Sequence, residues 1–165
     1  KAAKALNEYK MVVVYDPDDS KAIMQLYKEY GVEVSAKVVT YTSYIADAIE
    51  GGALKGEKGK KTVAIQDPYQ LSRDLGEIKP LRTIVSAYAN VKELLLNGTE
   101  TVWAGNILMA QYLPDVIEKV AERRIFNAKS VNAKILVTAS PAEYTSLKAI
   151  KEDVEIIPIE DLILG

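Results

Sequence analysis

The chain contains no cysteine and no histidine among its 165 residues. Without thiolates or imidazoles, it lacks the usual protein ligands of zinc, haem iron and iron–sulfur clusters. It also lacks the side chains that most often serve as thiolate nucleophiles or as general bases near neutral pH. Polar chemistry therefore falls to carboxylates, lysines, tyrosines and hydroxyls, and we expect no metal site and no cofactor.

Long apolar runs and an excess of one charge are missing as well. No segment approaches the run of about 20 apolar residues that a membrane-spanning helix needs, and no signal peptide is visible. The formal net charge is −2 and the lysines are dispersed, which gives no basic patch for nucleic acid. We therefore expect a cytoplasmic protein without membrane insertion or nucleic-acid binding.

The composition is that of an ordinary globular protein, with 48% hydrophobic and 27% charged residues. Its length is enough for one well-filled core, so we expect a single domain over residues 1–165. Short, β-branched apolar runs recur along it, and such runs are typical of strands buried on both faces of a parallel sheet. These runs lie at 11–15, 34–41, 62–65, 135–138 and 154–157, with a weaker one at 91–96.

Helical patterns lie between the apolar runs. A helix that begins near Thr42 is expected to end at Gly51-Gly52, because glycine suits the left-handed position after a helix. Two further helices are expected over 18–30 and 115–131, each with one apolar face. The faces comprise Ala22, Ile23, Leu26, Tyr27 and Tyr30 in the first, and Ile117, Val120, Ala121, Ile125 and Ala128 in the second. Alternating strands and helices predict a three-layer α/β fold, Rossmann-like, with a mostly parallel sheet and helices on both faces.

One pattern occurs twice, at an offset of 124 residues. Residues 12–19 and 136–143 each read as strand, polar residue, proline, and an acid three positions after the polar residue. Asp16 and Ser140 are the polar residues, and we predict that both cap helices whose first residue is the proline. Ser140 and Glu143 then form a capping box, in which the Glu143 side chain reaches back to the Ser140 amide. The alternative is that the acids of these segments bind a cation or a substrate.

Three separate segments carry a more specific framework. They read Asp67-Pro68-Tyr69-Gln70-Leu71-Ser72-Arg73, Trp103-Ala104-Gly105, and Ser140-Pro141-Ala142-Glu143. Together they resemble the cysteine-rich CCG domain of heterodisulfide reductase B subunits and glycolate oxidase iron–sulfur subunits. In that family the segments read roughly Asp-Pro-Cys-x-Leu-x-Arg, Cys-Cys-Gly and Cys-Pro-x-Cys. The spacing matches the family, with 33 residues between Tyr69 and Trp103 and 35 between Ala104 and Ser140.

The resemblance implies an iron–sulfur site that has lost its ligands. In the family, thiolates from three loops meet at the C-terminal ends of parallel strands, where open α/β sheets generally place ligands. The resemblance further implies that residues 1–50 are the tail of a first repeat and 60–165 a second one. The places of the cluster ligands, called the ligand places below, are held by Tyr69, Trp103, Ala104, Ser140 and Glu143.

Two interpretations of the rings at Tyr69 and Trp103 remain open. They fill the volume that a cluster would occupy, or they line a pocket for a flat ligand or a partner's side chain. If Trp103 is buried, its indole N–H needs an acceptor, for which Asn106 is a candidate.

Asp67 and Arg73 belong to the part of the motif that does not bind metal. We expect Asp67 to cap the turn at Pro68 and Arg73 to pair with Asp74 or Glu77. A ligand cleft at the ligand places would draw its polar groups from Asp67, Asn106, Asp16 and Asp19.

The main functional hypothesis follows from the resemblance and the missing ligands. It is a cluster-free homologue that acts as a structural or subunit-docking module beside redox subunits of an electron-transfer oxidoreductase. Such a complex would be of the heterodisulfide reductase type or the glycolate or glycerol-3-phosphate dehydrogenase type. The chain alone is then not expected to be catalytic. The alternatives are a small-molecule binding protein or enzyme with a new site in the former cluster cleft, and self-association of the domain.

Overall fold

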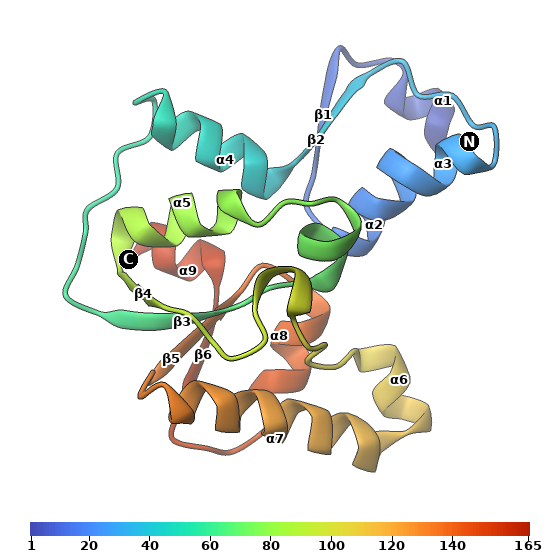
Figure 1. Ribbon diagram of the computed structural model, residues 1–165. Helices are drawn as coiled ribbons and strands as arrows, with labels where there is room; N and C mark the ends of the chain where they lie inside the picture. Colours follow the sequence, from blue (N-terminus) through green and yellow to red (C-terminus); the bar gives the residue numbers. More distant parts are fainter.

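The computed structural model describes residues 1–165 and contains two separate parallel sheets (Figure 1). Two strands pair in the N-terminal sheet, β1 with β2, and four form the larger sheet in the order β4-β3-β5-β6. All neighbouring strands run parallel. The strands are β1 (Met11–Val14), β2 (Lys37–Thr40), β3 (Thr62–Gln66), β4 (Asn90–Lys92), β5 (Ile135–Thr138) and β6 (Glu155–Pro158).

Helices connect successive strands, as parallel pairing requires. Two of the helical segments contain π-helical turns, at Ala22–Leu26 and at Gln70–Asp74, and Gly98–Glu100 is a short 3-10 turn. The α-helices are α1 (Ala2–Leu6), α2 (Pro17–Lys21), α3 (Tyr27–Glu29), α4 (Tyr41–Glu50), α5 (Lys79–Tyr88), α6 (Ile107–Tyr112), α7 (Pro114–Ser130), α8 (Pro141–Lys148) and α9 (Ile159–Leu164).

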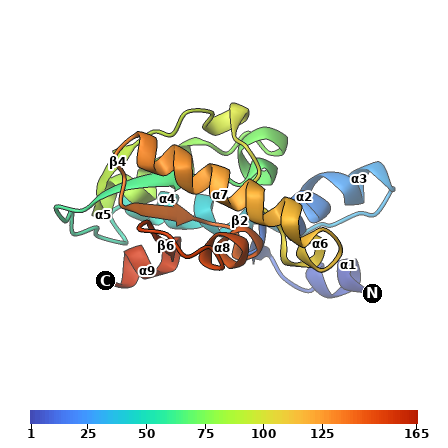
Figure 2. The same ribbon diagram turned by 90° about the horizontal axis from the view of Figure 1, so that it is seen from below.

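The larger sheet is the middle of three layers, with α4, α5 and α9 on one face and α7 and α8 on the other (Figure 1), and Figure 2 looks onto the face that α7 crosses. Because side chains alternate along a strand, Val63 and Ile65 of β3 face a core shared with α4, α5 and α9. Ala64 faces the opposite core, which contains buried residues of α7 and α8. This arrangement confirms the predicted α/β fold with parallel strands and helices on both faces, and the strands lie within a few residues of the apolar runs.

The parallel strands fall into two sheets, whereas the sequence suggested one. The reason is the position of α4, the helix that follows β2, which packs on the larger sheet. Tyr41 and Ala46 of α4 belong to the core of the larger sheet, and α4 packs along α5. Because α4 serves as a cover of the larger sheet, β1 and β2 stand to one side with α1, α2 and α3 (Figure 1).

Helix ends follow the predicted local signals. Asp16 caps α2 by accepting hydrogen bonds from the amides of Asp18 (2.8 Å) and Asp19 (3.3 Å), and Pro17 is the first helical residue. Ser140 caps α8 in the same way, accepting from the Glu143 amide at 3.3 Å. Helix α4 ends at Glu50, and Gly52 follows with a φ of +73°.

The two predicted apolar helix faces differ in how far they are buried. In α7, Ile117, Ala121, Ile125 and Ala128 are buried as expected. In the helical segment from α2 to α3, none of the five predicted residues is buried, and Tyr30 is 79% exposed. The segment packs on the small two-stranded sheet and, through α2, on the turn Gln70–Asp74, and these contacts leave its apolar face only partly covered. None of the helices has the length and apolar character that crossing a membrane requires.

Candidate functional site

The candidate site lies where β3 and β5 end side by side. Gln66 at the end of β3 is in register with Thr138 at the end of β5, so the loops that follow them start from the same sheet edge. The first loop leads to Asp67 and Tyr69, and the second to Ser140 and helix α8. The segment 101–106 provides a third loop, which hydrogen bonds attach to the other two.

Glu143 connects all three loops from the first turn of α8. Its side chain is buried, with 2% exposed, and Oε1 accepts a hydrogen bond from the Ala104 amide at 3.1 Å. Both carboxylate oxygens lie within hydrogen-bonding distance of Gln66 Nε2, at 3.1 and 3.2 Å. Gln66 Nε2 also donates to the Val102 carbonyl at 3.0 Å. The carboxylate of Glu143 thus forms a cross-link between β3, the segment 101–106 and α8.

This geometry corrects half of the predicted capping box. The Ser140 hydroxyl accepts from the Glu143 amide as predicted, but the Glu143 side chain does not return to the Ser140 amide. That amide donates to Thr138 Oγ1 at 3.2 Å instead. Glu143 is directed inward because Ala104 and Gln66 offer it buried donors, which a local sequence motif does not reveal.

Arg124 of α7 joins Gln66 and Glu143 in one polar network, from the face of the larger sheet that α7 and α8 cover. Its side chain is fully buried, and Nε donates to Gln66 Oε1 at 2.5 Å. Nη1 donates to the carbonyls of Leu95 and Leu96, while Nη2 has no partner. Sequence patterns did not identify Arg124 or Gln66 as site residues. The signal was present for Arg124, which lies at helical spacing from Ile117 and Ala121 on the buried face of α7.

Burial shifts the pKa values of the two ionisable side chains in this network, Glu143 and Arg124. It raises the pKa of Glu143 to about 8, although the Ala104 amide, Gln66 and Arg124 favour the carboxylate. Burial also lowers the pKa of the Arg124 guanidinium, with Glu143 and Asp67 acting in the opposite direction. A glutamate that titrates near pH 8 makes the cross-link sensitive to pH.

Asp67, in the loop that follows β3, joins that loop to α5 and to Gly98 through its buried carboxylate. Its carboxylate is fully buried and pairs with Arg82 of α5 at 2.5 and 2.9 Å, and the Gly98 amide donates to it at 2.8 Å. Arg82 also pairs with Glu93, and although burial opposes its charge, the hydrogen bonds to both acids raise its pKa. The predicted role of Asp67 as a cap of the Pro68 turn is therefore wrong, because Arg82 and Gly98 occupy its oxygens.

Arg73 also has partners other than those predicted. It donates to the Thr99 carbonyl at 3.0 Å and to the Thr101 carbonyl at 2.8 Å, instead of pairing with Asp74 or Glu77. Asp74 pairs with Lys21, and Glu77 accepts from Thr40. Arg73 thus holds the start of the segment 101–106 through its backbone.

The two rings at ligand places lie together but are not packed into the core. Tyr69 and Trp103 are both half-buried and line a hollow of about 350 Å³ together with Arg73 and Thr101. The Lys21 ammonium lies 5.9 Å from the centre of the Tyr69 ring. Asn106 does not serve Trp103, since its side chain caps α6 by accepting from Leu108 and Met109. The rings form one wall of an open hollow.

The remaining candidate residues lie apart from this hollow. Ser140 lines a different cavity of about 180 Å³ together with Tyr15 and Tyr144. No hydrogen bond or ion pair joins Asp16 or Asp19 to the three loops. Their neighbour Asp18 makes that connection, accepting from Gln70 Nε2 at 2.7 Å. Of the ligand places, the structure directly connects Ala104, Glu143 and Ser140, and separately brings together Tyr69 and Trp103.

An iron–sulfur cluster does not fit this donor set. The ligand places provide no thiolate, and the Glu143 carboxylate already accepts from Ala104 and Gln66. The Ser140 hydroxyl is used by the Glu143 amide. Nowhere in the chain do three acidic side chains gather closely enough to hold a metal ion.

Comparison with known proteins shows distant homology to one component of a heterodisulfide reductase. The chain is 32% identical over 143 residues to the D subunit of the dihydromethanophenazine:CoB–CoM heterodisulfide reductase of Methanosarcina acetivorans. It is 30% identical over 142 residues to the corresponding D subunit of Methanosarcina barkeri. In both cases the match covers 81% of this chain and 34% of the relative, so the chain spans about a third of their length. No protein-family model matches the chain.

Two solved structures show a looser similarity. Glutamate racemase RacE1 of Bacillus anthracis aligns with a TM-score of 0.47 and 15% identity, over 98% of this chain and 58% of the racemase. An aspartate racemase homologue of Pyrococcus horikoshii aligns with a TM-score of 0.38 and 15% identity, over 99% of this chain and 68% of the homologue.

Proposed function

We propose that the chain is a cluster-free homologue of the iron–sulfur CCG domains and serves as a structural or subunit-docking module. The observation that carries the proposal is the buried Glu143, whose carboxylate accepts from Gln66 and from the Ala104 amide. Two of the ligand places, Ala104 and Glu143, are therefore joined directly to each other. Hydrogen bonds of Glu143 and Gln66 hold the three loops together here, as the metal ligands do in the family.

The companions of this module are redox subunits of a larger complex. The distant relatives are subunits of a heterodisulfide reductase, which supports a complex of that type. A complex of the glycolate or glycerol-3-phosphate dehydrogenase type is the alternative, and it rests on the resemblance of the three segments alone. In such a complex the chain contributes a surface and no electron-transfer centre, and it is not catalytic alone. Its place is the cytoplasm.

A tagged copy of the protein in its native host tests this role. After mild cross-linking and purification at native expression levels, mass spectrometry should recover subunits of an electron-transfer oxidoreductase in stoichiometric amounts. A matched preparation with an unrelated tagged protein of similar size gives the background. Recovery of the chain without any redox subunit would contradict the docking role.

A second function is favoured by the hollow beside Tyr69 and Trp103. Two half-buried rings, with the exposed Arg73 beside them, suit a flat ligand that carries an acceptor group. Trp103 is the single tryptophan of the chain, so its fluorescence reports binding there directly. Titration with aromatic carboxylates should give saturable quenching that Arg73→Ala abolishes and Arg123→Ala, a change on the exposed side of α7, preserves. Quenching that never saturates, or that both variants retain equally, would reject this second function.

A further inference from the structure

A small cavity lies where strands of both sheets end. Tyr15 directly follows β1, Thr138 ends β5 and Pro158 ends β6, and all three residues line the cavity. The cavity is therefore at the carboxyl edge of the parallel strands, where open α/β sheets generally place ligands. Helix α8 adds Tyr144 to its walls and helix α9 adds Glu160. The volume is about 180 Å³, which limits an occupant to a small molecule.

The charge of this cavity comes from one carboxylate. Glu160 is the only charged residue among those that line it, and no lysine or arginine is present to neutralise it there. The Oε1 atom of Glu160 is buried, and no hydrogen-bond donor of the chain reaches it. A buried carboxylate oxygen without a donor is costly, because burial removes the water that would otherwise hydrate it. The cavity thus offers an unused negative charge to a ligand.

Aromatic rings surround this carboxylate. Tyr15 and Tyr144 line the cavity, and the ring of Tyr41 packs against that of Tyr15 with 4.9 Å between the ring centres. Burial and the negative charge of Glu160 raise the pKa of Tyr15 to about 12, and they raise the pKa of Tyr41 as well. Both phenols therefore stay neutral around physiological pH, and neither adds a second charge. The faces of such rings attract cations electrostatically.

We propose that this cavity binds a small organic ammonium ion, such as a methylated amine. The positive charge of the ligand compensates the Glu160 carboxylate, while its methyl groups pack on the rings of Tyr15 and Tyr144. An inorganic cation fits less well, because metal ions take several oxygen ligands and no three acidic side chains gather here. An anion is disfavoured, since the walls contain no basic residue.

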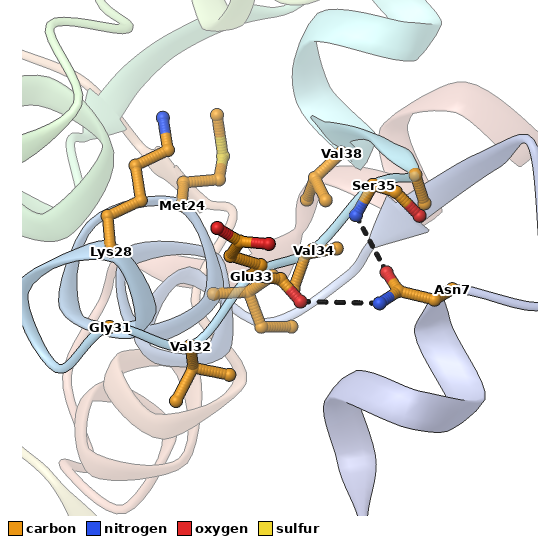
Figure 3. A pocket seen from close by; sticks show the side chains of 11 residues that line it. Asn7, Met24, Lys28, Gly31, Val32, Glu33, Val34, Ser35 and Val38 are labelled. Carbon is orange, nitrogen blue, oxygen red and sulfur yellow. Dashed lines mark hydrogen bonds between the residues drawn. The ribbon is translucent and has the colours of Figure 1, made fainter.

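A larger groove beside the N-terminal sheet lacks this selectivity (Figure 3). Its volume is about 650 Å³, but Lys28 and Glu33 both line it, so charges of both signs are present. The amide side chain of Asn7 is occupied there by hydrogen bonds with the Glu33 carbonyl and the Ser35 amide. The smaller cavity is the one whose walls select a cation. The ammonium site does not depend on the proposed role in a redox complex.

Thermal unfolding in tetramethylammonium chloride tests the site, with sodium chloride at the same concentrations as the control for ionic strength. A ligand that binds only the folded state raises Tm as its concentration increases. We therefore expect a saturable rise of Tm in tetramethylammonium chloride beyond that in sodium chloride. Amide NMR spectra recorded over the same titration should show perturbed signals around Tyr144 and Glu160.

Variants of the cavity walls identify the groups that hold the cation. Glu160→Gln keeps the shape of the side chain but removes its charge, and should weaken tetramethylammonium binding about tenfold. Asp161→Asn, a change at the exposed neighbour on α9, is the matched control and should bind as the wild type does. Tyr15→Leu should weaken binding several-fold, whereas Tyr15→Phe keeps the ring and should preserve it. Circular dichroism establishes that each variant is folded.

Three results would overturn the ammonium site. The first is the same Tm in the two salts at every concentration. The second is binding that Glu160→Gln retains in full, and the third is amide perturbation confined to the hollow at Tyr69 and Trp103. If Glu160→Gln does not fold, the pair at Tyr15 decides, because equal binding by Tyr15→Leu and Tyr15→Phe would contradict recognition of the cation by the ring.

Discussion

Replacement of Glu143 by glutamine should remove most of the pH dependence of stability near neutrality. In the folded chain, burial raises the pKa of Glu143 from its ordinary value of 4.5 to about 8. Between these two values the folded state binds a proton that the unfolded state has lost. The free energy of unfolding therefore decreases as the pH rises through this window, and the stabilisation by the proton is complete only below about pH 4.5.

The magnitude follows from the width of the window. Each pH unit between 4.5 and about 8 is worth about 1.4 kcal/mol for one proton, so complete titration costs the folded state on the order of 5 kcal/mol. The pKa of about 8 already includes the opposing effect of the hydrogen bonds from Ala104 and Gln66, which favour the carboxylate. Because the chain has no histidine, it lacks the side chain that ordinarily titrates in this range.

Urea unfolding from pH 5 to pH 9 measures this effect. Glutamine resembles the protonated acid, so Glu143→Gln and the wild type should have similar free energies of unfolding at pH 5. At pH 9 the variant should be more stable by up to several kcal/mol. Glu118→Gln, a change on the exposed side of α7, should follow the wild type at every pH. If the difference between Glu143→Gln and the wild type stays constant over the whole range, Glu143 does not titrate as the structure requires.

Three further predictions test other contacts. Ser140→Ala removes the cap of α8 and should lower the free energy of unfolding by about 1 kcal/mol; an unchanged urea midpoint would rule out the cap as a source of stability. Asp67→Asn leaves Arg82 without its buried partner and should cost about 3–5 kcal/mol, whereas Glu93→Gln at the exposed end of the same cluster should cost about 1 kcal/mol or less. Equal costs would show that burial of Asp67 does not matter. Trp103→Ala should cost clearly less than the roughly 3–5 kcal/mol of a fully buried large aromatic, because Trp103 lines an open hollow; a loss in that range would place the ring in the core.

Local patterns in the sequence predict much of the fold, and the reasons are visible in particular elements. Buried parallel strands need continuous apolar residues, so β3 and β5 stand out by composition alone. The caps at Asp16 and Ser140 involve residues two or three positions apart, which a sequence pattern displays directly. The separation of the sheets was not predictable in this way, since it depends on α4 packing against α5 across a loop of the chain.

The polar contacts of the site depend on distant residues and were largely missed. The Gln66–Glu143 hydrogen bonds join residues 77 positions apart, and Arg124 reaches Gln66 over 58 positions. Glu143, Asp67 and Arg73 each have a plausible neighbour in the sequence, and in each case a partner from another part of the chain replaces it. The framework of the three segments located the site, but tertiary packing determines what its side chains contact.

The iron and acid-labile sulfide content of the protein, after anaerobic purification and anaerobic reconstitution, tests most directly whether the site is free of a cluster. We predict that neither is present in stoichiometric amounts and that no visible absorption of a cluster develops, since the ligand places contain no thiolate and Glu143 is engaged by Gln66 and Ala104. Stoichiometric iron and sulfide with the absorption of a cluster would contradict the view that a hydrogen-bonded network has replaced the metal centre.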